Sequence, residues 1–509
     1  MYSRTQLLAL LLPPLTALAC QNDPPRIVGE DEGWADNTDS GNNGMGSDSS
    51  ADDTDTDGSD STGWDTEDTN DTNDTNDTND TDTDNPVEDE SDLPTFTRTL
   101  LVEQPGSAFL TEVDLDGDGY DEYLMTCLSE GIGWDIPPLG PGGAYVLSRL
   151  GGAASGTIGT WATTEYFSYW DYIDYPNVST LFDIDNDGVE DWVIGTGFLM
   201  KPTGRIIWMK GTESTGTLNF GEPQDLDVPD TSRWYHETIP VDMDGDGDTD
   251  FVTTNNNGTL DGWGDSKLEW FENLGLNDEA SFEVHEIGSY GGALLTMHDL
   301  DDDGDQDIIL PQYGGSPSLL WMEQGDDGET WTEHQINDTT GRGFNAELAD
   351  MDGDGDMDLV YGNHNHQSAD SSDEQVMGVY WWEIPDADEV TSLDNWDANI
   401  HVIHEGFYVD ETDPSANGAP GVVRLGDIDG DGDIDVSASG DGDDGIYLFV
   451  NDGTGVFDTV TIDTGLVMAG DHRMTDLDGD GDMDFIWSIF GEISLTGPES
   501  AVFAYLQDD

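Results

Sequence analysis

The chain has 509 residues and carries 113 Asp and Glu against 12 Lys and Arg, a formal net charge of −101. Contacts to nucleic-acid phosphates or to an anionic membrane surface need clustered Lys and Arg, so this charge excludes both kinds of partner. Apolar residues are only 35%, but there are 63 Gly and 16 each of Trp, Tyr and Phe. A core is therefore expected from short strands joined by glycine-rich turns.

Residues 1–20 have the order of an export signal. Arg4 precedes the apolar run 7–12, which is too short to span a membrane, and the small residues Ala17 and Ala19 lead to Cys20. This order resembles a bacterial lipoprotein signal, and the resemblance implies that Cys20 is lipidated. The protein is then expected at the outer membrane or cell surface, attached only through that cysteine. Ordinary signal-peptidase cleavage, giving a secreted protein, is the alternative.

Residues 21–92 are rich in Asp, Thr and Asn and contain a single basic residue, Arg26. No apolar periodicity is present, and the like charges repel one another, so the segment is predicted to be a disordered stalk. The other cysteine, Cys127, lies in an apolar run and is expected to be a buried small side chain, so no disulfide framework is predicted.

From residue 93 onward the chain becomes a repeat array. The pattern Asp-x-Asp-x-Asp-Gly-x-x-Asp/Glu occurs seven times, and its copies start 49 to 77 residues apart. We name these copies Asp loops 1 to 7 and number their positions 1 to 9. One short motif per unit of about 60 residues is typical of a propeller. The loops are residues 114–122, 183–191, 242–250, 299–307, 350–358, 427–435 and 476–484.

The chemistry of the Asp loops favours calcium. Carboxylates at positions 1, 3 and 5 of a tight loop converge, Gly at position 6 allows the turn, position 7 offers its backbone carbonyl, and position 9 completes the shell. An oxygen-only cage of this size suits a hard cation with six or more ligands, and magnesium would prefer fewer protein ligands. Seven in-phase copies argue against solvated turns without an ion, so about seven calcium ions are expected.

The expected calcium ligands are, loop by loop, Asp114, Asp116, Asp118, Tyr120 and Glu122; Asp183, Asp185, Asp187, Val189 and Asp191; Asp242, Asp244, Asp246, Asp248 and Asp250; Asp299, Asp301, Asp303, Asp305 and Asp307; Asp350, Asp352, Asp354, Asp356 and Asp358; Asp427, Asp429, Asp431, Asp433 and Asp435; and Asp476, Asp478, Asp480, Asp482 and Asp484.

The flanking sequence predicts four strands per unit. A short apolar run follows each loop at once, an aromatic strand such as 268–273 follows in most units, and a third run such as 282–287 comes next. With the strand that leads into the loop, each unit has the size of a propeller blade. Only two strands follow loop 7, so residues 96–102 are predicted to complete the last blade and close the ring.

The Asp loops and the Trp-rich strands resemble the FG-GAP/VCBS repeat family, whose calcium-loop propeller also forms the head of integrin α chains. The resemblance covers residues 93–509, although the name-giving pieces are poorly kept apart from Asn417-Gly-Ala-Pro420. It implies an all-β, seven-bladed propeller with calcium between the first two strands of each blade. It also implies that the opposite face gathers the segments leading into the innermost strands.

Those segments supply the candidate ligand-binding residues. Arg together with Trp and Tyr around a central depression would bind an acidic sugar or a carboxylate-bearing peptide. Packing between blades and pairing of each Arg with an Asp is the alternative for any one of them. The residues are Tyr175, Arg233, Trp234, Tyr235, His236, Tyr290, Arg342, Asn345, His472 and Arg473.

Three functions remain open at this point. A calcium-dependent adhesion or binding module, monomeric, with a polysaccharide or surface-protein ligand, is favoured. A polysaccharide lyase is the second, because Tyr235, His236, Tyr290 and Arg342 would supply a base and a neutralising cation beside a uronic acid. No nucleophile motif is present, and no catalytic residue is assigned. A purely structural surface protein is the third.

Overall fold

The computed structural model describes residues 93–508, except for 129–140, 152–155, 198–203, 227–232, 257–265, 276–279, 314–316, 326, 366–376, 408–418, 442–444, 467–468 and 490–499. The chain forms two units, Met1–Thr83 and Asp84–Asp509, and the second contains every described residue. The predicted signal peptide and stalk, with Cys20, lie outside the described residues.

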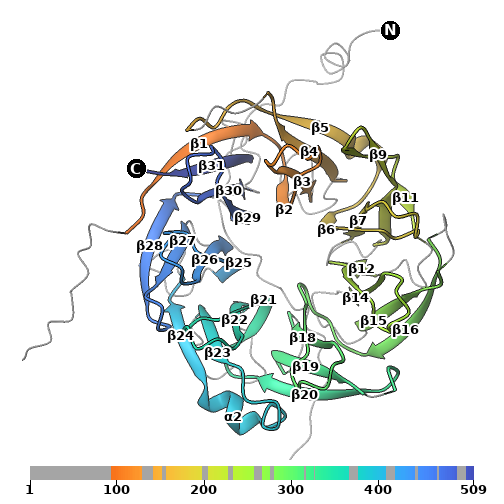
Figure 1. Cartoon of the computed structure of the whole chain (residues 1–509), viewed down its shortest axis with the longest axis vertical. Coiled ribbons are helices and arrows are strands. Elements are labelled where there is room, and N and C mark those ends of the chain that lie inside the picture. Colours follow the sequence, from red (N-terminus) through yellow and green to blue (C-terminus); the bar gives the residue numbers. More distant parts are fainter. Residues whose placement is uncertain are drawn as a thin grey trace, which may run out of the picture. The chain divides into compact units, whose positions relative to one another are not determined.

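Seven antiparallel sheets are arranged around a central axis, with β2, β6, β21, β25 and β29 among the innermost strands (Figure 1). The fold is a seven-bladed, all-β propeller, as the sequence predicts. Because the turns are rich in Gly, each blade is a compact meander of short strands.

The strands of each blade run outward from the axis. Blade 1 has β2 (Ser107–Val113), β3 (Glu122–Cys127), β4 (Gly143–Arg149) and β5 (Trp161–Phe167); blade 2 has β6 (Pro176–Phe182), β7 (Asp191–Thr196), β8 (Ile206–Met209) and β11 (Gln224–Asp225). Blade 3 has β12 (Trp234–Tyr235) and β13 (Ile239–Val241), then β14 (Asp250–Asn256), β15 (Lys267–Asn273) and β16 (Phe282–Gly288). Blade 4 has β17 (Thr296–His298), β18 (Asp307–Pro311), β19 (Leu319–Gln324) and β20 (Trp331–Asn337). Blade 5 has β21 (Arg342–Ala349), β22 (Asp358–Asn365), β23 (Gly378–Glu383) and β24 (Ile400–Glu405). Blade 6 has β25 (Ala419–Gly426), β26 (Asp435–Asp441), β27 (Gly445–Asn451) and β28 (Phe457–Thr464). Blade 7 has β29 (Ala469–Thr475), β30 (Asp484–Ile489), β31 (Ala501–Gln507) and β1 (Phe96–Glu103).

Blade 7 joins the two ends of the described chain. Strand β1 pairs antiparallel with β31, from Phe96 opposite Gln507 to Glu103 opposite Ala501. In Figure 1 the orange β1 lies along the dark blue β31. The predicted ring closure by residues 96–102 is therefore confirmed, and it pairs an edge of β31 that would otherwise be open.

Two blades depart from the simple four-strand meander. In blade 3 the innermost strand is broken, so that β12 and β13 pair separately with β14 on either side of residues 236–238. In blade 2 the outermost strand has only two residues, and a hairpin of β9 (Gly211–Ser214) and β10 (Thr217–Phe220) precedes it. The sequence analysis did not predict the break or the hairpin.

The hydrophobic core lies between neighbouring blades rather than within one. One cluster contains Met351 and Val360 of blade 5 with Val436 and Phe449 of blade 6. Another joins blade 1 to blade 7 across the closure and includes Cys127, which is buried, as expected. Each sheet buries its faces only against its neighbours, so the blades depend on one another for stability.

The helices are short. Helix α2 (Leu393–Ala398) buries Trp396 among core side chains of blades 4 and 5, and η2 (Tyr169–Asp171) is a single 3₁₀ turn. Among the described residues, no helix is long and apolar enough to cross a membrane.

Candidate metal-binding loops and the axial channel

Every Asp loop connects the first and second strands of its blade, at the end of the innermost strand. The Gly at position 6 has a positive φ in all seven copies, from 87° at Gly188 to 107° at Gly481. Position 4 is left-handed as well, with φ of 57° to 77°, and it is always Gly, Asn or Asp. These residue types adopt this backbone conformation most readily, so position 4 belongs to the motif although the sequence pattern left it open.

The carboxylate at position 1 folds the loop around itself. In loop 1, Asp114 Oδ1 accepts a hydrogen bond from the Gly117 N–H at 2.8 Å, and Asp114 Oδ2 accepts one from the Gly119 N–H at 3.0 Å. The carboxylate at position 5 likewise accepts a hydrogen bond from the backbone at position 7: the Tyr120 N–H donates to Asp118 Oδ1 at 3.0 Å. These bonds recur in loops 5, 6 and 7.

The carboxylate at position 9 ties the loop to its blade. In loop 4, Asp307 is buried; its Oδ2 accepts a hydrogen bond from the Leu300 N–H and its Oδ1 accepts one from the Gln324 N–H, both at 2.9 Å. All seven loops have the first of these bonds, from the N–H at position 2, at 2.8–3.1 Å. The second bond, from a backbone N–H at or just beyond the end of the third strand of the blade, is present in five loops.

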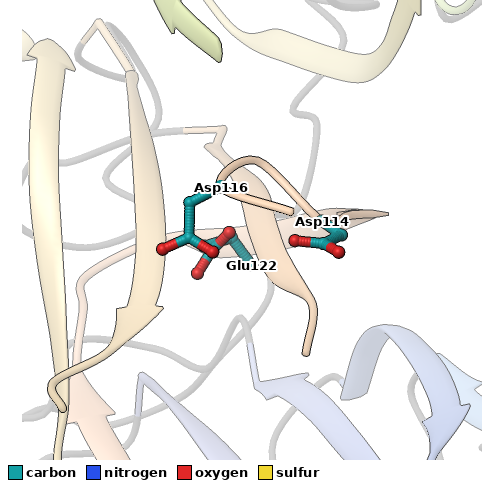
Figure 2. A group of neighbouring side chains, drawn as sticks. All are labelled: Asp114, Asp116 and Glu122. Carbon is teal, nitrogen blue, oxygen red and sulfur yellow. The ribbon is translucent and has the colours of Figure 1, made fainter. Parts of the chain in front are cut away.

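The loops gather carboxylates closely enough to hold a cation. In loop 1, ligand oxygens of Asp114, Asp116 and Glu122 lie within 4.8 Å of one another, and Figure 2 shows the three side chains around one turn of the chain. Groups of this kind occur in each of loops 1 to 5. The donors are oxygens only, as a hard cation requires. At position 3 of loops 2 and 7, a buried oxygen of Asp185 and of Asp478 has no hydrogen-bond partner, which also fits a bound cation.

The position 9 carboxyl groups titrate far from their usual range. Burial, reinforced by the neighbouring Asp carboxylates, raises the pKa of Glu122 to about 7. The same causes raise the pKa of Asp191, Asp307, Asp358, Asp435 and Asp484 to about 7 and raise the pKa of Asp250. Without a cation, the carboxyl group at position 9 therefore binds a proton more tightly than an ordinary carboxyl group does.

A lysine from outside loop 2 places a positive charge against its carboxylates. The ammonium group of Lys210, which follows β8, contacts Asp185 and lies 2.8 Å from Asp187 Oδ2. Hydrogen bonds to these two carboxylates outweigh partial burial and raise the pKa of Lys210. Among the described residues, loop 2 is thus the Asp loop whose carboxylates pair directly with an ammonium group, although its backbone geometry is the same.

Most of the predicted ligand-binding side chains are buried. Tyr175, Arg233, Trp234, Tyr235, His236, Asn345 and His472 are each less than a tenth exposed. The Asn345 side chain bridges blades 5 and 6, accepting from the Val423 N–H at 3.1 Å and donating to the Val423 carbonyl at 2.9 Å. His472 stacks on Trp487 with ring centroids 3.7 Å apart, and burial holds its pKa well below the usual value. The other three are half-buried.

His236 belongs to an aromatic cluster that reaches across the axis. Its ring lies 5.6 Å from that of Phe109 in blade 1 and 5.3 Å from that of Phe344 in blade 5, both edge to face. Phe109 also packs with Val422 of blade 6. We name Phe109, His236, Phe344 and Val422 the axial cluster; it brings blades 1, 3, 5 and 6 together.

Tyr290 and Arg342 do not join the axial cluster. The Tyr290 hydroxyl donates to the carboxylate of Glu333 on the outermost strand of blade 4. Arg342 begins β21, and its partial burial lowers the pKa of its guanidinium. The structure therefore does not collect the ten predicted residues into one surface, and the ligand face stays a prediction.

Arg473 lies in a buried charge network that the sequence analysis missed. The carboxylate of Asp471 is inaccessible to solvent and accepts from Arg473 Nη1 at 2.7 Å and from Arg424 Nη2 at 2.8 Å. Arg424 also pairs with Glu347. These two guanidinium groups hold the pKa of Asp471 below its usual value, although burial opposes them. A signal existed, because Glu347, Arg424 and Arg473 each stand three residues before the first Asp of a loop.

A cavity of about 370 Å³ lies beside this network, among the innermost strands of the propeller. It is lined by residues of blades 2 to 6: Val178, Glu237, Leu294, Leu295, Thr296, Asn345, Ala346, Glu347, Leu348 and Arg424. Burial raises the pKa of Glu237 to about 8, although Arg424 and a hydrogen bond from the Leu295 backbone lower it. Glu237 is another residue that no sequence pattern had singled out.

Comparison with known protein families agrees with this architecture. A family model described as an FG-GAP-like repeat matches residues 299–361 and 409–487, which include Asp loops 4 to 7. The chain is therefore a seven-bladed β-propeller that contains FG-GAP-like repeats in these two segments, as the sequence resemblance implied. No curated protein sequence matches the chain.

Solved structures of similar strand arrangement include two lyases and a sialidase. The rhamnogalacturonan lyase YesW is 12% identical with a TM-score of 0.41, over 81% of this chain and 75% of that one. The Bacillus licheniformis rhamnogalacturonan lyase PL11 is 13% identical with the same TM-score and the same coverage. The Trypanosoma rangeli sialidase in complex with sialic acid is 11% identical with a TM-score of 0.38, over 72% of this chain and 59% of that one. Likenesses this distant say nothing about activity.

Proposed function

We propose that this chain is a calcium-stabilised binding module exported to the cell surface. The observation that supports it best is the sevenfold recurrence of one oxygen-only loop that is hydrogen-bonded to its own blade through position 9. Six or more oxygen ligands in a flexible loop suit calcium better than magnesium, which keeps most of its water. Positions 1, 3, 5, 7 and 9 of each loop would hold the ion.

Calcium in these loops would neutralise clustered carboxylates in a chain of net charge −101. The chain's own part is to hold the loop: the position 1 carboxylate organises the turn, and the position 9 carboxylate fixes the loop to the blade. Because such a cage does not exist in the unfolded chain, calcium binding and folding are expected to be coupled.

Calcium removal tests this part of the proposal. We expect excess chelator to lower the melting temperature by at least 10 °C, since each site filled to 100 times its Kd stabilises the fold by about 2.7 kcal/mol. Calcium added back should restore the melt, and magnesium at the same concentration should not. An unchanged melt in chelator would show that calcium is not a structural ion here.

The ligand is proposed to be a polysaccharide or a surface protein, bound by a monomer of the propeller. The calcium-loaded protein would be tested against acidic and neutral polysaccharides, with mass spectrometry of the products. Binding without cleavage supports the binding module. Cleavage would replace it with the lyase alternative, and no binding to any polysaccharide would leave a protein ligand or a structural role.

Surface attachment is proposed to depend on Cys20. The charged, apolar and small-residue order of residues 1–20 supports export, and a cysteine at the end of that order supports lipidation. Cys20→Ala should move the protein from the membrane fraction to the soluble fraction of the producing cell. If the variant still sediments with membranes, the lipid anchor is wrong.

A further inference from the structure

The axial cavity of about 370 Å³ lies between the axial cluster and the Asp loops. In β21, Phe344 of the axial cluster precedes the lining residues 345–348, and Asp loop 5 begins at Asp350. In β25 the order is the same, since Val422 precedes Arg424 and loop 6 begins at Asp427. The cavity is thus on the loop side of the aromatic rings, not on the face where the sequence predicts the ligand.

We propose that this cavity binds one uncharged sugar residue of a glycan, held by Glu237, Glu347 and Arg424. The assignment deepens the proposed function, on which it rests for the choice of a carbohydrate ligand. Its volume is at the lower end of the 300–1,000 Å³ that is usual for small-molecule sites, which suits a terminal sugar rather than a long chain.

The cavity wall has both kinds of surface that a sugar ring needs. Glu347 and Arg424 form an ion pair on one part of it, and Glu237 provides a third polar side chain. Leu294, Leu295 and Leu348 also line it, and Leu295 and Leu348 pack at the same time against the cores between neighbouring blades. Hydroxyl groups donate and accept hydrogen bonds, so they match a wall that offers both, while the C–H faces of the ring match the leucines.

Electrostatics selects an uncharged ligand. Arg424 and Arg473 bring two positive charges, Asp471 and Glu347 bring two negative charges, and all four belong to one network. Burial raises the pKa of Glu237 to about 8, so its carboxyl group is largely protonated at neutral pH. The four charges of this network already pair with one another, so an added anion or cation would find no uncompensated charge in the cavity wall.

The test is saturation-transfer NMR on the calcium-loaded full chain with small glycosides. The probes are the methyl glycosides of glucose, galactose, mannose and N-acetylglucosamine, with methyl glucuronide and methyl glucosaminide as charged analogues. At least one neutral glycoside should bind, and methyl glucuronide and methyl glucosaminide should both bind at least tenfold more weakly than that glycoside. Absence of binding by every neutral glycoside, or tighter binding of a charged one, would overturn the assignment.

Two pairs of variants locate the binding. Leu294→Trp fills the cavity and should abolish binding, whereas Leu100→Trp places the same indole at an exposed position of β1 and should not. Glu237→Gln keeps a neutral donor and acceptor and should bind like the wild type, but Glu237→Leu should lose at least tenfold in affinity. If the Leu294→Trp variant has a lowered melting temperature, the comparison of Glu237→Gln with Glu237→Leu provides the test instead.

Failure of this inference is distinguishable from failure of the proposed function. If Leu294→Trp and Glu237→Leu, with intact melts, bind glycosides and polysaccharides as the wild type does, the axial site is wrong and the binding module stands with its ligand elsewhere. If the calcium-loaded wild type binds no polysaccharide but takes a neutral glycoside in a cavity-dependent way, the axial site stands and its natural ligand is a smaller sugar.

Discussion

In each Asp loop the ninth residue directs its carboxylate back to the start of the loop, where it meets the N–H of the second residue. Asp307 shows the full arrangement, with one oxygen bonded to Leu300 and the other to Gln324 on β19. Charge-assisted hydrogen bonds of this kind are stronger than neutral ones. Position 9 therefore stabilises the blade as well as completing the proposed cage.

Asp307→Asn is expected to lower the free energy of unfolding by about 1–3 kcal/mol, because its amide NH₂ cannot accept a bond that the carboxylate accepts and leaves a buried donor unpaired. Denaturant unfolding in saturating calcium measures the change. Asp305→Asn, two residues earlier in the same loop, is the control and should change stability by less than about 0.5 kcal/mol, since only its backbone is assigned a role. Equal losses in both variants would contradict the special role of position 9.

Lys210 makes loop 2 the exception among the seven. A cation that enters this loop must approach an ammonium group already in contact with Asp185 and Asp187. Lys210→Met is therefore expected to raise the calcium affinity of loop 2 at least tenfold, about 1.4 kcal/mol.

Calcium titration calorimetry of the wild type should show six ions bound more tightly than a seventh, and the Lys210→Met variant should show seven similar sites. Lys267→Met is a matched control, because the Lys267 side chain is as exposed as that of Lys210 but pairs with Glu286 outside any loop. Seven equal sites in the wild type would refute the prediction.

Strand β1 contacts three other parts of the ring: β31, β28 and the core shared by blades 1 and 7. Seven of its eight residues pair with β31, and its Arg98 pairs with Asp463 of β28 at 2.9 Å. Leu101 and Val102 pack onto the core cluster shared by blades 1 and 7. A strand with these contacts is part of the last blade and not an appendage.

A chain that begins at Gln104 lacks β1 and should therefore melt at least 10 °C lower and self-associate through the exposed edge of β31. Thermal melting and sedimentation velocity would measure both effects. A chain that begins at Leu93 keeps β1 and is the control, expected to melt like the full chain. The same melt for both truncations would mean that β1 contributes nothing to closure.

The sequence was sufficient for the elements that repeat. Seven copies of one loop fixed the number of blades, and the apolar run after each loop is the second strand in every case. Elements that break the repeat were missed. The gap between β12 and β13 depends on residues 236–238, where His236 turns toward rings of blades 1 and 5, and no local pattern carries that information.

The candidate sites divide in the same way. Carboxylates that converge within nine residues are readable from spacing, so the loop residues were found. Arg424 and Asp471 meet across 47 residues, and Glu237 reaches the same cavity from blade 3. Only the ring brings these groups together, which is why the sequence suggested Arg473 as a free ligand-binding cation when it is paired with Asp471.

For the whole molecule, pH and calcium are expected to act in opposite directions. Six position 9 carboxyl groups have a pKa of about 7 in the calcium-free fold, against about 4 in an unfolded chain. A folded pKa above the unfolded one means that the fold binds the proton more tightly. Stability of the calcium-free protein should therefore rise as pH falls from 8 to 5 and be lost as pH rises through 7.

Thermal melts of the calcium-free protein at pH 5 and pH 8 test this expectation, with the higher melting temperature at pH 5. Calcium requires the ionised carboxylates, so the increase in melting temperature that calcium causes should be larger at pH 8 than at pH 5. A calcium-free melting temperature that is lower at pH 5 would show that burial of these charged carboxylates does not dominate the pH dependence of stability.

Closure by β1 also determines when the protein can finish folding. Thr97, at the start of the ring, donates a hydrogen bond to Asp508, 411 residues later in the chain. During synthesis β1 emerges before every other strand of the ring and its partner β31 after them, so this contact can form only once all seven blades have been made. Every earlier intermediate carries an unpaired edge, and the strongly negative charge keeps such intermediates apart while they wait.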